Sequence, residues 1–128
     1  MTYVNDPIGD FLTRMRNAQS ARRKTCSAPW SRIKEELCAV LKKEGWIEDI
    51  AITGEMPKKE IEVTFVPGKR LDLERVSKPG RRVYAKAGEL NSVLHGYGIA
   101  ILTTSEGLIT DREARKRNLG GELLCTIS

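Results

Sequence analysis

The sequence predicts an α+β protein built from two small domains. Apolar residues recur first at helical spacing and then alternate along short extended segments, so helices and strands are mixed along the chain. Pro67-Gly68 interrupts this pattern near the middle of the 128 residues, and neither half has many large apolar residues. We therefore expect domains at residues 1–67 and 68–128 that pack against each other, the second with a mostly antiparallel sheet and short helices.

The first half begins with a predicted amphipathic helix. Asn5-Asp6-Pro7 is a helix start, because a side-chain oxygen can accept an unpaired N–H and proline fits the first turn. The apolar residues that follow at helical spacing are Ile8, Phe11, Leu12, Met15 and Ala18. Residues 20–24 are polar and basic, and they lead into a short extended segment near Thr25 and Cys26.

A second helix and a hairpin complete the first half. Pro29 is expected to open this helix and Gly45 to end it. Its predicted buried stripe consists of Ile33, Leu37, Val40 and Leu41. Residues 46–52 read as a strand, residues 53–57 as a turn, and the alternation within residues 61–65 indicates the returning strand.

The second half opens with a predicted hairpin that carries a basic cluster. Residues 71–77 and 81–86 read as strands joined by a turn at Lys78-Pro79-Gly80. Val83 and Ala85 face one side of the second strand, and the other side is polar. That polar side holds Arg82, Tyr84 and Lys86. The basic cluster consists of Lys69, Arg70, Arg75, Lys78, Arg81, Arg82 and Lys86.

Helices and strands alternate in the rest of the second half. We expect a short helix at residues 89–94 and a buried strand at residues 99–102. Thr110 and Glu113 have the spacing of a capping box, which predicts a basic helix that ends before Gly120-Gly121. The last strand is expected to follow these glycines.

The charge pattern favours a polyanionic partner. Lys and Arg number 22 against 17 Asp and Glu, which gives a net charge of +5. Through Gly68 there are eleven basic and ten acidic residues, whereas from Lys69 onward there are eleven basic and seven acidic ones. A basic cluster is usually a solvated surface, but its place on a predicted hairpin favours binding.

Several function classes have no support in the sequence. His95 is the one histidine and has no acid or nucleophile beside it, so we expect it to be structural. No phosphate-binding glycine loop or catalytic group of residues is recognisable, which predicts neither an enzyme nor a cofactor. Cys26, Cys38 and Cys125 are widely spaced, and predict free thiols in a reducing cytoplasm without a metal site. Neither a secretory signal nor a membrane span is predicted.

A run of hydroxyl side chains, Thr103-Thr104-Ser105-Glu106-Gly107, follows the predicted buried strand. Hydroxyls and loop amides can bond to phosphate, ribose and base edges with little bulk, which suits an irregular RNA. Alone, the segment could equally be a Ser/Thr-rich turn before a helix cap. RNA binding is favoured by the basic residues that follow it, which are Arg112, Arg115, Lys116 and Arg117.

These motifs resemble the signature of the bacterial small-subunit ribosomal protein eight family. The resemblance is carried by residues 98–115, by Gly120-Gly121-Glu122 and by residues 76–84. It also includes the opening motifs Asp6-Pro7-Ile8, Leu12-Thr13-Arg14 and Arg16-Asn17-Ala18. It therefore spans essentially the whole chain.

The resemblance implies a two-domain α/β protein of the 30S subunit that binds the central domain of 16S ribosomal RNA early in assembly. It further implies that the protein helps to organise the platform and contacts small-subunit proteins five and twelve. A cytoplasmic location on the ribosome follows, as does repression of translation through the messenger RNA of its own operon.

The resemblance also assigns RNA-binding residues. The main contact maps to Thr103, Thr104, Ser105 and Gly107 in the C-terminal domain, and Tyr84 matches a position that meets RNA. Secondary phosphate contacts map to Arg14, Arg22, Arg23 and Lys24. The charge pattern adds Arg81, Arg82, Lys86 and Arg115. Glu106 departs from the family, which most often has lysine there, so it either points away from the RNA or weakens binding.

Two other functions stay open. A free-standing RNA-binding repressor of the same fold would stay at the top of a gradient in which a ribosomal component migrates with small subunits. An enzyme acting on nucleic acid would show nuclease activity with added metal, and His95→Ala would abolish that activity.

Overall fold

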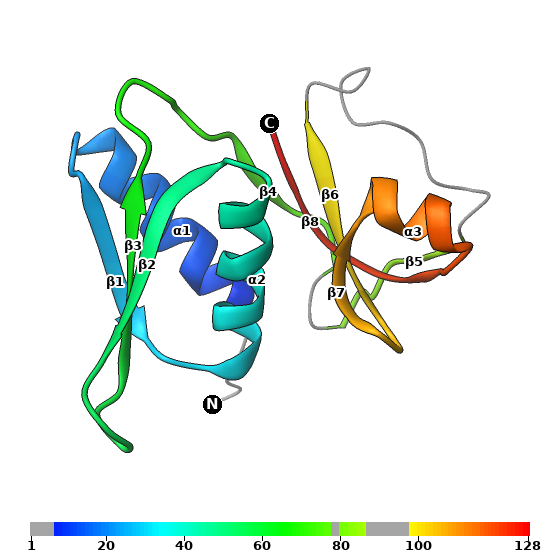
Figure 1. Ribbon diagram of the computed structural model, residues 1–128, viewed down its shortest axis with the longest axis horizontal. Coiled ribbons are helices and arrows are strands. Elements are labelled where there is room, and N and C mark those ends of the chain that lie inside the picture. The colour runs from blue at the N-terminus through cyan, green and yellow to red at the C-terminus, as the bar shows by residue number, and fades with distance from the viewer. Residues whose placement is uncertain (1–6, 78–79, 87–97) are drawn as a thin grey trace. The chain divides into compact units, whose positions relative to one another are not determined.

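The computed structural model describes residues 7–77, 80–86 and 98–128 (Figure 1). Helices and antiparallel sheets are mixed along the chain, which confirms the predicted α+β class. The chain divides into two compact units, one formed by residues 10–71 and the other by residues 1–9 and 72–128. None of the helices in the described part combines the length and the apolar character that a membrane crossing requires.

The N-terminal unit, residues 10–71, has two helices and a three-stranded antiparallel sheet of order β1-β3-β2. Its elements are α1 (Pro7–Ser20, which begins in the other unit), β1 (Thr25–Pro29), α2 (Arg32–Lys43), β2 (Ile47–Thr53) and β3 (Glu60–Phe65). The register pairs Cys26 with Val63 and Ala28 with Ile61, and all four side chains are buried. Because paired residues share a face, one face of the sheet packs in the core (Figure 1).

The predicted buried stripe of α1 is confirmed. Ile8, Phe11, Leu12, Met15 and Ala18 are all buried. In α2, Leu37 and Leu41 are buried as predicted, whereas Ile33 and Val40 are half-buried. The sequence interpretation missed Lys34, which is buried because its Nζ donates a 2.9 Å hydrogen bond to the Pro29 carbonyl oxygen. Burial lowers the pKa of this amine.

The predicted start of the second helix is wrong by a few residues. Pro29 ends β1, and the N-cap of α2 is Ser31, whose hydroxyl accepts a hydrogen bond from the Lys34 N–H. A serine cap satisfies one of the unpaired N–H groups of the first turn, which a proline two residues earlier does not. Gly45 follows the last residues of α2 with φ +81°, as its predicted role requires.

The C-terminal unit comprises residues 72–128 and residues 7–9 of the described start, and its described residues contain a five-stranded sheet and the helix α3. Its elements are β4 (Leu73–Arg75), β5 (Tyr84–Ala85), β6 (Ile99–Thr104), β7 (Gly107–Thr110), α3 (Asp111–Arg117) and β8 (Gly121–Ile127). The strand order is β4-β8-β6-β7, and β5 also pairs with β8. All these pairs are antiparallel.

The predicted basic hairpin is wrong. β4 pairs with residues 125–127 of β8 and β5 with residues 121–122, so both lie along one edge of the same strand instead of pairing with each other. The buried Ser77 hydroxyl accepts a hydrogen bond from the Val83 N–H, which draws the chain together between the two strands. Backbone partners on β8 thus outcompete a local hairpin.

The predicted start of α3 at Thr110 is confirmed. The Thr110 hydroxyl accepts a hydrogen bond from the Glu113 N–H, and Asp111 begins the helix. α3 packs on one face of the sheet through Ala114, which belongs to a buried cluster with Ala100, Leu102 and Ile109. The predicted helix at residues 89–94, the His95 loop, the Lys78-Pro79 turn and the Asn5-Asp6 helix start lie outside the described residues.

Candidate nucleic-acid interface

A row of side chains crosses three strands on the face of the C-terminal sheet opposite α3. Glu122 of β8 pairs with Tyr84 of β5 on one side and with Thr103 of β6 on the other. Directly paired residues share a face, whereas the neighbouring pair Leu102–Leu123 belongs to the cluster under α3. Tyr84, Glu122 and Thr103 therefore lie side by side on the face that the helix leaves uncovered.

Tyr84 is the most exposed residue of this row. It is 69% exposed, and the chain around it alternates as predicted, with Val83 and Ala85 half-buried and Arg82 and Lys86 exposed. A hollow of about 330 Å³ lies beside the ring and is lined by Tyr84, Ala85, Lys86, Gly120 and Gly121. The other described side chains do not cover the face of this ring, so a flat group can stack on it from the hollow.

Gly120 and Gly121 let the neighbouring strands approach β8. A Cβ at Gly121 would stand 2.2 Å from the Thr103 carbonyl oxygen, and one at Gly120 would stand 2.7 Å from that of Ala85. Contacts this short between carbon and oxygen do not occur, so any side chain would push the strands apart. The glycine pair thus holds Tyr84 and Thr103 at their places in the row.

The hydroxyl segment is a tight hairpin turn, not a loop that leads into the helix. Thr103 and Thr104 end β6, Gly107 begins β7 with φ +100°, and Ser105 and Glu106 form the turn. Glycine adopts this positive φ readily, and Gly107 is the position where the chain reverses into the next strand.

The three hydroxyls are not equivalent. The Thr104 hydroxyl donates a 2.9 Å hydrogen bond to the Gly107 carbonyl oxygen and accepts one from the Glu106 N–H. It therefore closes the turn. Ser105 is exposed at the tip, and within the described residues its hydroxyl has no hydrogen bond. Thr103 is half-buried in the row with Tyr84.

Glu106 is held by an ion pair. Its carboxylate lies 3.0 Å from the Arg117 guanidinium, which also reaches Glu113 at 3.3 Å. Both side chains of the Glu106–Arg117 pair are about half exposed, so the pair contributes little to stability, but it offsets the acid's charge. Arg117 of α3 thus offsets the negative charge that Glu106 places at the tip of the turn.

Arg82 is also paired. It lies 3.3 Å from Glu122, whose carboxylate accepts a further hydrogen bond of 3.0 Å from the buried Ser77 hydroxyl. Arg81 and Lys86 are exposed, and in the described chain their side chains form no hydrogen bond or ion pair. The structure thus leaves only part of the predicted basic cluster available as free charge.

Arg115 does not join the row. It lies on α3, on the opposite side of the sheet, where it pairs with the buried Asp111 at 3.0 Å. Asp111 also accepts a 3.3 Å hydrogen bond from the Ala100 N–H, which ties the helix to β6. These contacts make Arg115 part of the support of the sheet.

The remaining predicted residues belong to the N-terminal unit. Arg14 pairs with Asp10 at 3.0 Å along α1. Arg22, Arg23 and Lys24 lie just after α1 and are exposed. The family resemblance assigned them, whereas the sequence interpretation missed Phe65 and placed Arg70 in the basic cluster of the second half. Both Phe65 and Arg70 line the same pocket, from the end of β3 onward. The two segments, residues 22–24 and 65–70, are about forty positions apart in sequence, so no local pattern indicates that they line one pocket.

The described residues contain no group of three or more His, Cys, Asp or Glu side chains placed to hold a metal ion. The three cysteines are free and buried. Burial raises the pKa of Cys38 and of Cys125 to about 12, and it also raises that of Cys26.

The chain is similar to known proteins over nearly its full length. The family described as ribosomal protein S8 matches residues 6–128. The small ribosomal subunit protein uS8 of Tolumonas auensis is 44% identical over 128 residues, with 98% of each chain covered. The uS8 proteins of Chromobacterium violaceum and Staphylococcus saprophyticus are each 47% identical, over 98% and 94% of this chain and 98% and 96% of their own.

Proposed function

Because the chain belongs to the ribosomal protein S8 family, we propose that it is a structural constituent of the small ribosomal subunit and binds ribosomal RNA directly. The observation that carries the proposal is the exposed Tyr84 ring in the row opposite α3, where Tyr84 and Thr103 flank Glu122 beside the Ser105 turn. We call Arg81, Tyr84, Lys86, Thr103 and Ser105 the C-terminal surface.

Each part of the C-terminal surface has a separate role in this proposal. Tyr84 stacks on a base in the hollow beside it, since an exposed ring accepts any base face. The Ser105 hydroxyl bonds to ribose or a base edge at the tip of the turn. Arg81 and Lys86 contact phosphates and so position the RNA.

Side chains that already form hydrogen bonds or ion pairs within the protein support RNA binding indirectly. Thr104 shapes the turn that presents Ser105, and Arg82 holds Glu122 in the row. Arg115 and Asp111 keep α3 on the sheet. We therefore assign Thr104, Arg82 and Arg115 positioning roles. Gly107 serves the same turn through its positive φ.

The finer parts of the proposal follow from family membership. We propose that the RNA is the central domain of 16S ribosomal RNA, that the protein supports the platform, and that small-subunit proteins five and twelve lie next to it. Its location would be cytoplasmic, on the ribosome. The same surface would also bind the messenger RNA of the protein's own operon and so repress its translation. We keep the predicted domains, residues 1–67 and 68–128, as a proposal, with secondary phosphate contacts from Arg14, Arg22, Arg23 and Lys24 in the first.

Sedimentation tests the ribosomal role. Cell extract in high salt is fractionated on a gradient, and the protein is detected with an antibody. A structural constituent migrates with small subunits. Migration only at the top of the gradient would contradict the proposal and favour a free-standing repressor.

A paired titration tests the surface. The probes are the RNA fragment recovered after crosslinking the protein to total RNA and a random duplex, both at one salt concentration. We expect Ser105→Ala to lose about 1–3 kcal/mol for the recovered fragment and little for the duplex. Thr104→Ala, the matched control, should instead lower the melting temperature, because it opens the turn. Equal losses of Ser105→Ala on both probes would remove Ser105 from specific recognition.

A further inference from the structure

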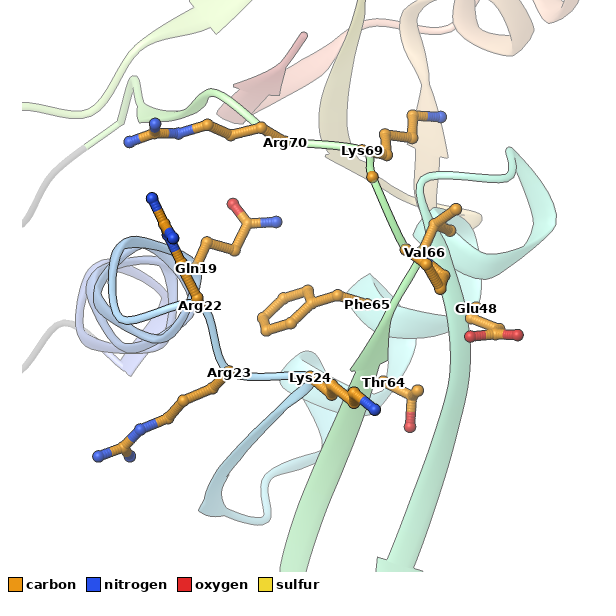
Figure 2. Close-up of a pocket in the computed structure, with 12 residues that line it drawn as sticks. Gln19, Arg22, Arg23, Lys24, Glu48, Thr64, Phe65, Val66, Lys69 and Arg70 are labelled. Carbon is orange, nitrogen blue, oxygen red and sulfur yellow. The ribbon is translucent and has the colours of Figure 1, made fainter.

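A pocket of about 560 Å³ lies in the N-terminal unit, between the end of α1 and residues 66–70 (Figure 2). Sites that take small organic groups fall in this range of volume. The pocket draws on segments far apart in sequence, with Gln19 and residues 22–24 on one side and residues 64–70 on the other. The Gln19 side chain joins the two, because it accepts a 3.3 Å hydrogen bond from the Leu71 N–H.

The centre of the pocket is apolar. Figure 2 shows the Phe65 ring extending into the space between the end of α1 and the segment that carries Lys69 and Arg70. Phe65 is 6% exposed, and its N–H donates a 3.0 Å hydrogen bond to the Lys24 carbonyl oxygen, so its position is held by the fold. Val66 and Pro67 extend this apolar lining.

The rim of the pocket is strongly basic, and most of its cationic side chains form no ion pair within the described residues. In the described part of the chain, the exposed side chains of Arg22, Arg23, Lys24 and Arg70 form no hydrogen bond or ion pair. Glu48 is the one acid in the lining. Lys69 differs, since its Nζ donates to the Gly45 carbonyl oxygen and lies 4.3 Å from the centre of the Trp46 ring.

The backbone at Arg22 singles this position out. Arg22 has φ +58°, and it ends α1 with the same pair of hydrogen bonds that ends α2 at Gly45 and α3 at Asn118. That conformation favours glycine or asparagine, so an arginine there is held against its backbone preference. Such a position indicates that the guanidinium at the rim has a use.

We propose that this pocket binds one unpaired nucleotide of an RNA, with its base against Phe65 and Val66 and its phosphates between Arg22 and Arg70. The inference rests on the proposed RNA-binding function and adds a second, separate site to it. An apolar centre with a cationic rim matches the two parts of a nucleotide, and guanidinium planes also stack on bases. A paired base stays inside its helix and cannot enter, which is why the nucleotide is unpaired.

Photocrosslinking with the full chain tests the site. The probe is a short single-stranded oligoribonucleotide that carries iodouridine, and the crosslinked peptides are identified by mass spectrometry. We expect crosslinks both at Phe65 and at Tyr84. A crosslink at Tyr84 alone overturns the pocket while the proposed function stands, and crosslinks at neither aromatic residue contradict both.

Titrations of variants separate base binding from charge. Phe65→Leu removes the ring but keeps an apolar core residue, and we expect roughly fivefold weaker binding of the oligonucleotide with no change for a duplex. Arg70→Gln, on an exposed side chain, should weaken oligonucleotide binding without affecting the fold. The control is Arg32→Gln, which removes the same charge from an 86% exposed side chain that lies outside the pocket and pairs with Glu36 at 3.1 Å.

Two results would overturn the proposal. One is that Arg70→Gln weakens oligonucleotide and duplex binding equally, because the rim would then contact only duplex phosphates. The other is that a glutamate-rich peptide displaces the oligonucleotide from wild-type protein but not from Arg70→Gln, because the pocket would then select an acidic protein segment.

Discussion

The two basic regions of this protein use their charge differently. In the C-terminal unit, Arg82 pairs with Glu122, Arg115 with Asp111 and Arg117 with Glu106. In the pocket of the N-terminal unit, no rim arginine is paired within the described residues, and the cations surround the Phe65 ring. The half with the larger excess of basic residues is thus the one in which Arg82, Arg115 and Arg117 are neutralised by carboxylates.

The difference teaches what a basic composition means for recognition. A paired guanidinium attracts a phosphate less, because the carboxylate beside it offsets its field. The C-terminal surface therefore depends on Tyr84, on the Ser105 turn and on the shape of the sheet. In the proposed N-terminal pocket, the rim cations give affinity that falls with salt and carries little sequence information, and the apolar centre beside Phe65 receives the base.

The largest expected effect is a loss of unfolding free energy when the backbone that supports the C-terminal surface is disturbed. Gly121→Ala places a Cβ 2.2 Å from the Thr103 carbonyl oxygen, so we expect a loss of at least about 3 kcal/mol in unfolding free energy. Gly107→Ala is the comparison, because its φ of +100° is strained but its Cβ meets nothing, and it should cost about 1–2 kcal/mol. Urea denaturation measures both. Equal losses would show that the strand approach is not the constraint.

The next largest effect is the loss of RNA affinity when the exposed Tyr84 ring is removed. Tyr84→Ala should weaken binding of the RNA fragment by about 1–3 kcal/mol, because one stacked base is lost. The melting temperature should hardly move, since the side chain is 69% exposed. Calorimetry and fluorescence titration measure the two quantities. A large drop in melting temperature would mean that the ring stabilises the fold.

A smaller effect sharpens the comparison in the N-terminal unit. Arg22→Gly relieves the φ of +58° and should raise the unfolding free energy by about 1 kcal/mol. The same change should make the slope of log affinity against log salt less negative by about 0.7 for single-stranded RNA, because one phosphate contact is removed. Asn118→Gly is the matched control and should leave the slope unchanged. An unaltered slope in Arg22→Gly would remove this arginine from the interface.

The smallest effect concerns the thiols. Burial raises the pKa of Cys125 from 9.0 to about 12, and burial also raises that of Cys26, although Arg14 and Arg23 partly oppose this. We expect no alkylation by iodoacetamide in native protein at pH 8, with Cys26 reacting first as pH rises. A thiol ionises at lower pH in the unfolded chain than when it is buried. The contribution of the buried, protonated Cys125 to the unfolding free energy is therefore complete below about pH 9 and is lost as the pH rises toward 12. Mass spectrometry of labelled protein checks the order.

Local rules made much of the fold predictable. The helical spacing of Phe11, Leu12 and Met15 identified the buried face of α1, and the spacing of Thr110 and Glu113 identified the start of α3. Alternation placed Tyr84 on an exposed face. Each of these features depends on residues within one or two turns or along one strand, so the chain specifies them without knowledge of its distant parts.

Partner choice over long sequence distances was decided only in the tertiary structure. The extended segments around Leu73 and Tyr84 were compatible with a hairpin, and only β8 offered both of them a better edge. The start of α2 shifted for the same reason, because Pro29 pairs with Glu60 of β3 as the last residue of β1, which leaves Ser31 to cap the helix.

The sequence by itself determined the family, the α+β class and the hydroxyl and basic motifs, because these reside in residue types and short spacings. The tertiary structure decided which of those residues stay available. Glu122 captures Arg82 across 40 positions, and Phe65 comes to lie beside Arg22 and Arg70 in one pocket. Ion pairs and pockets form between segments that only folding brings together, and for that reason no local pattern could have assigned them.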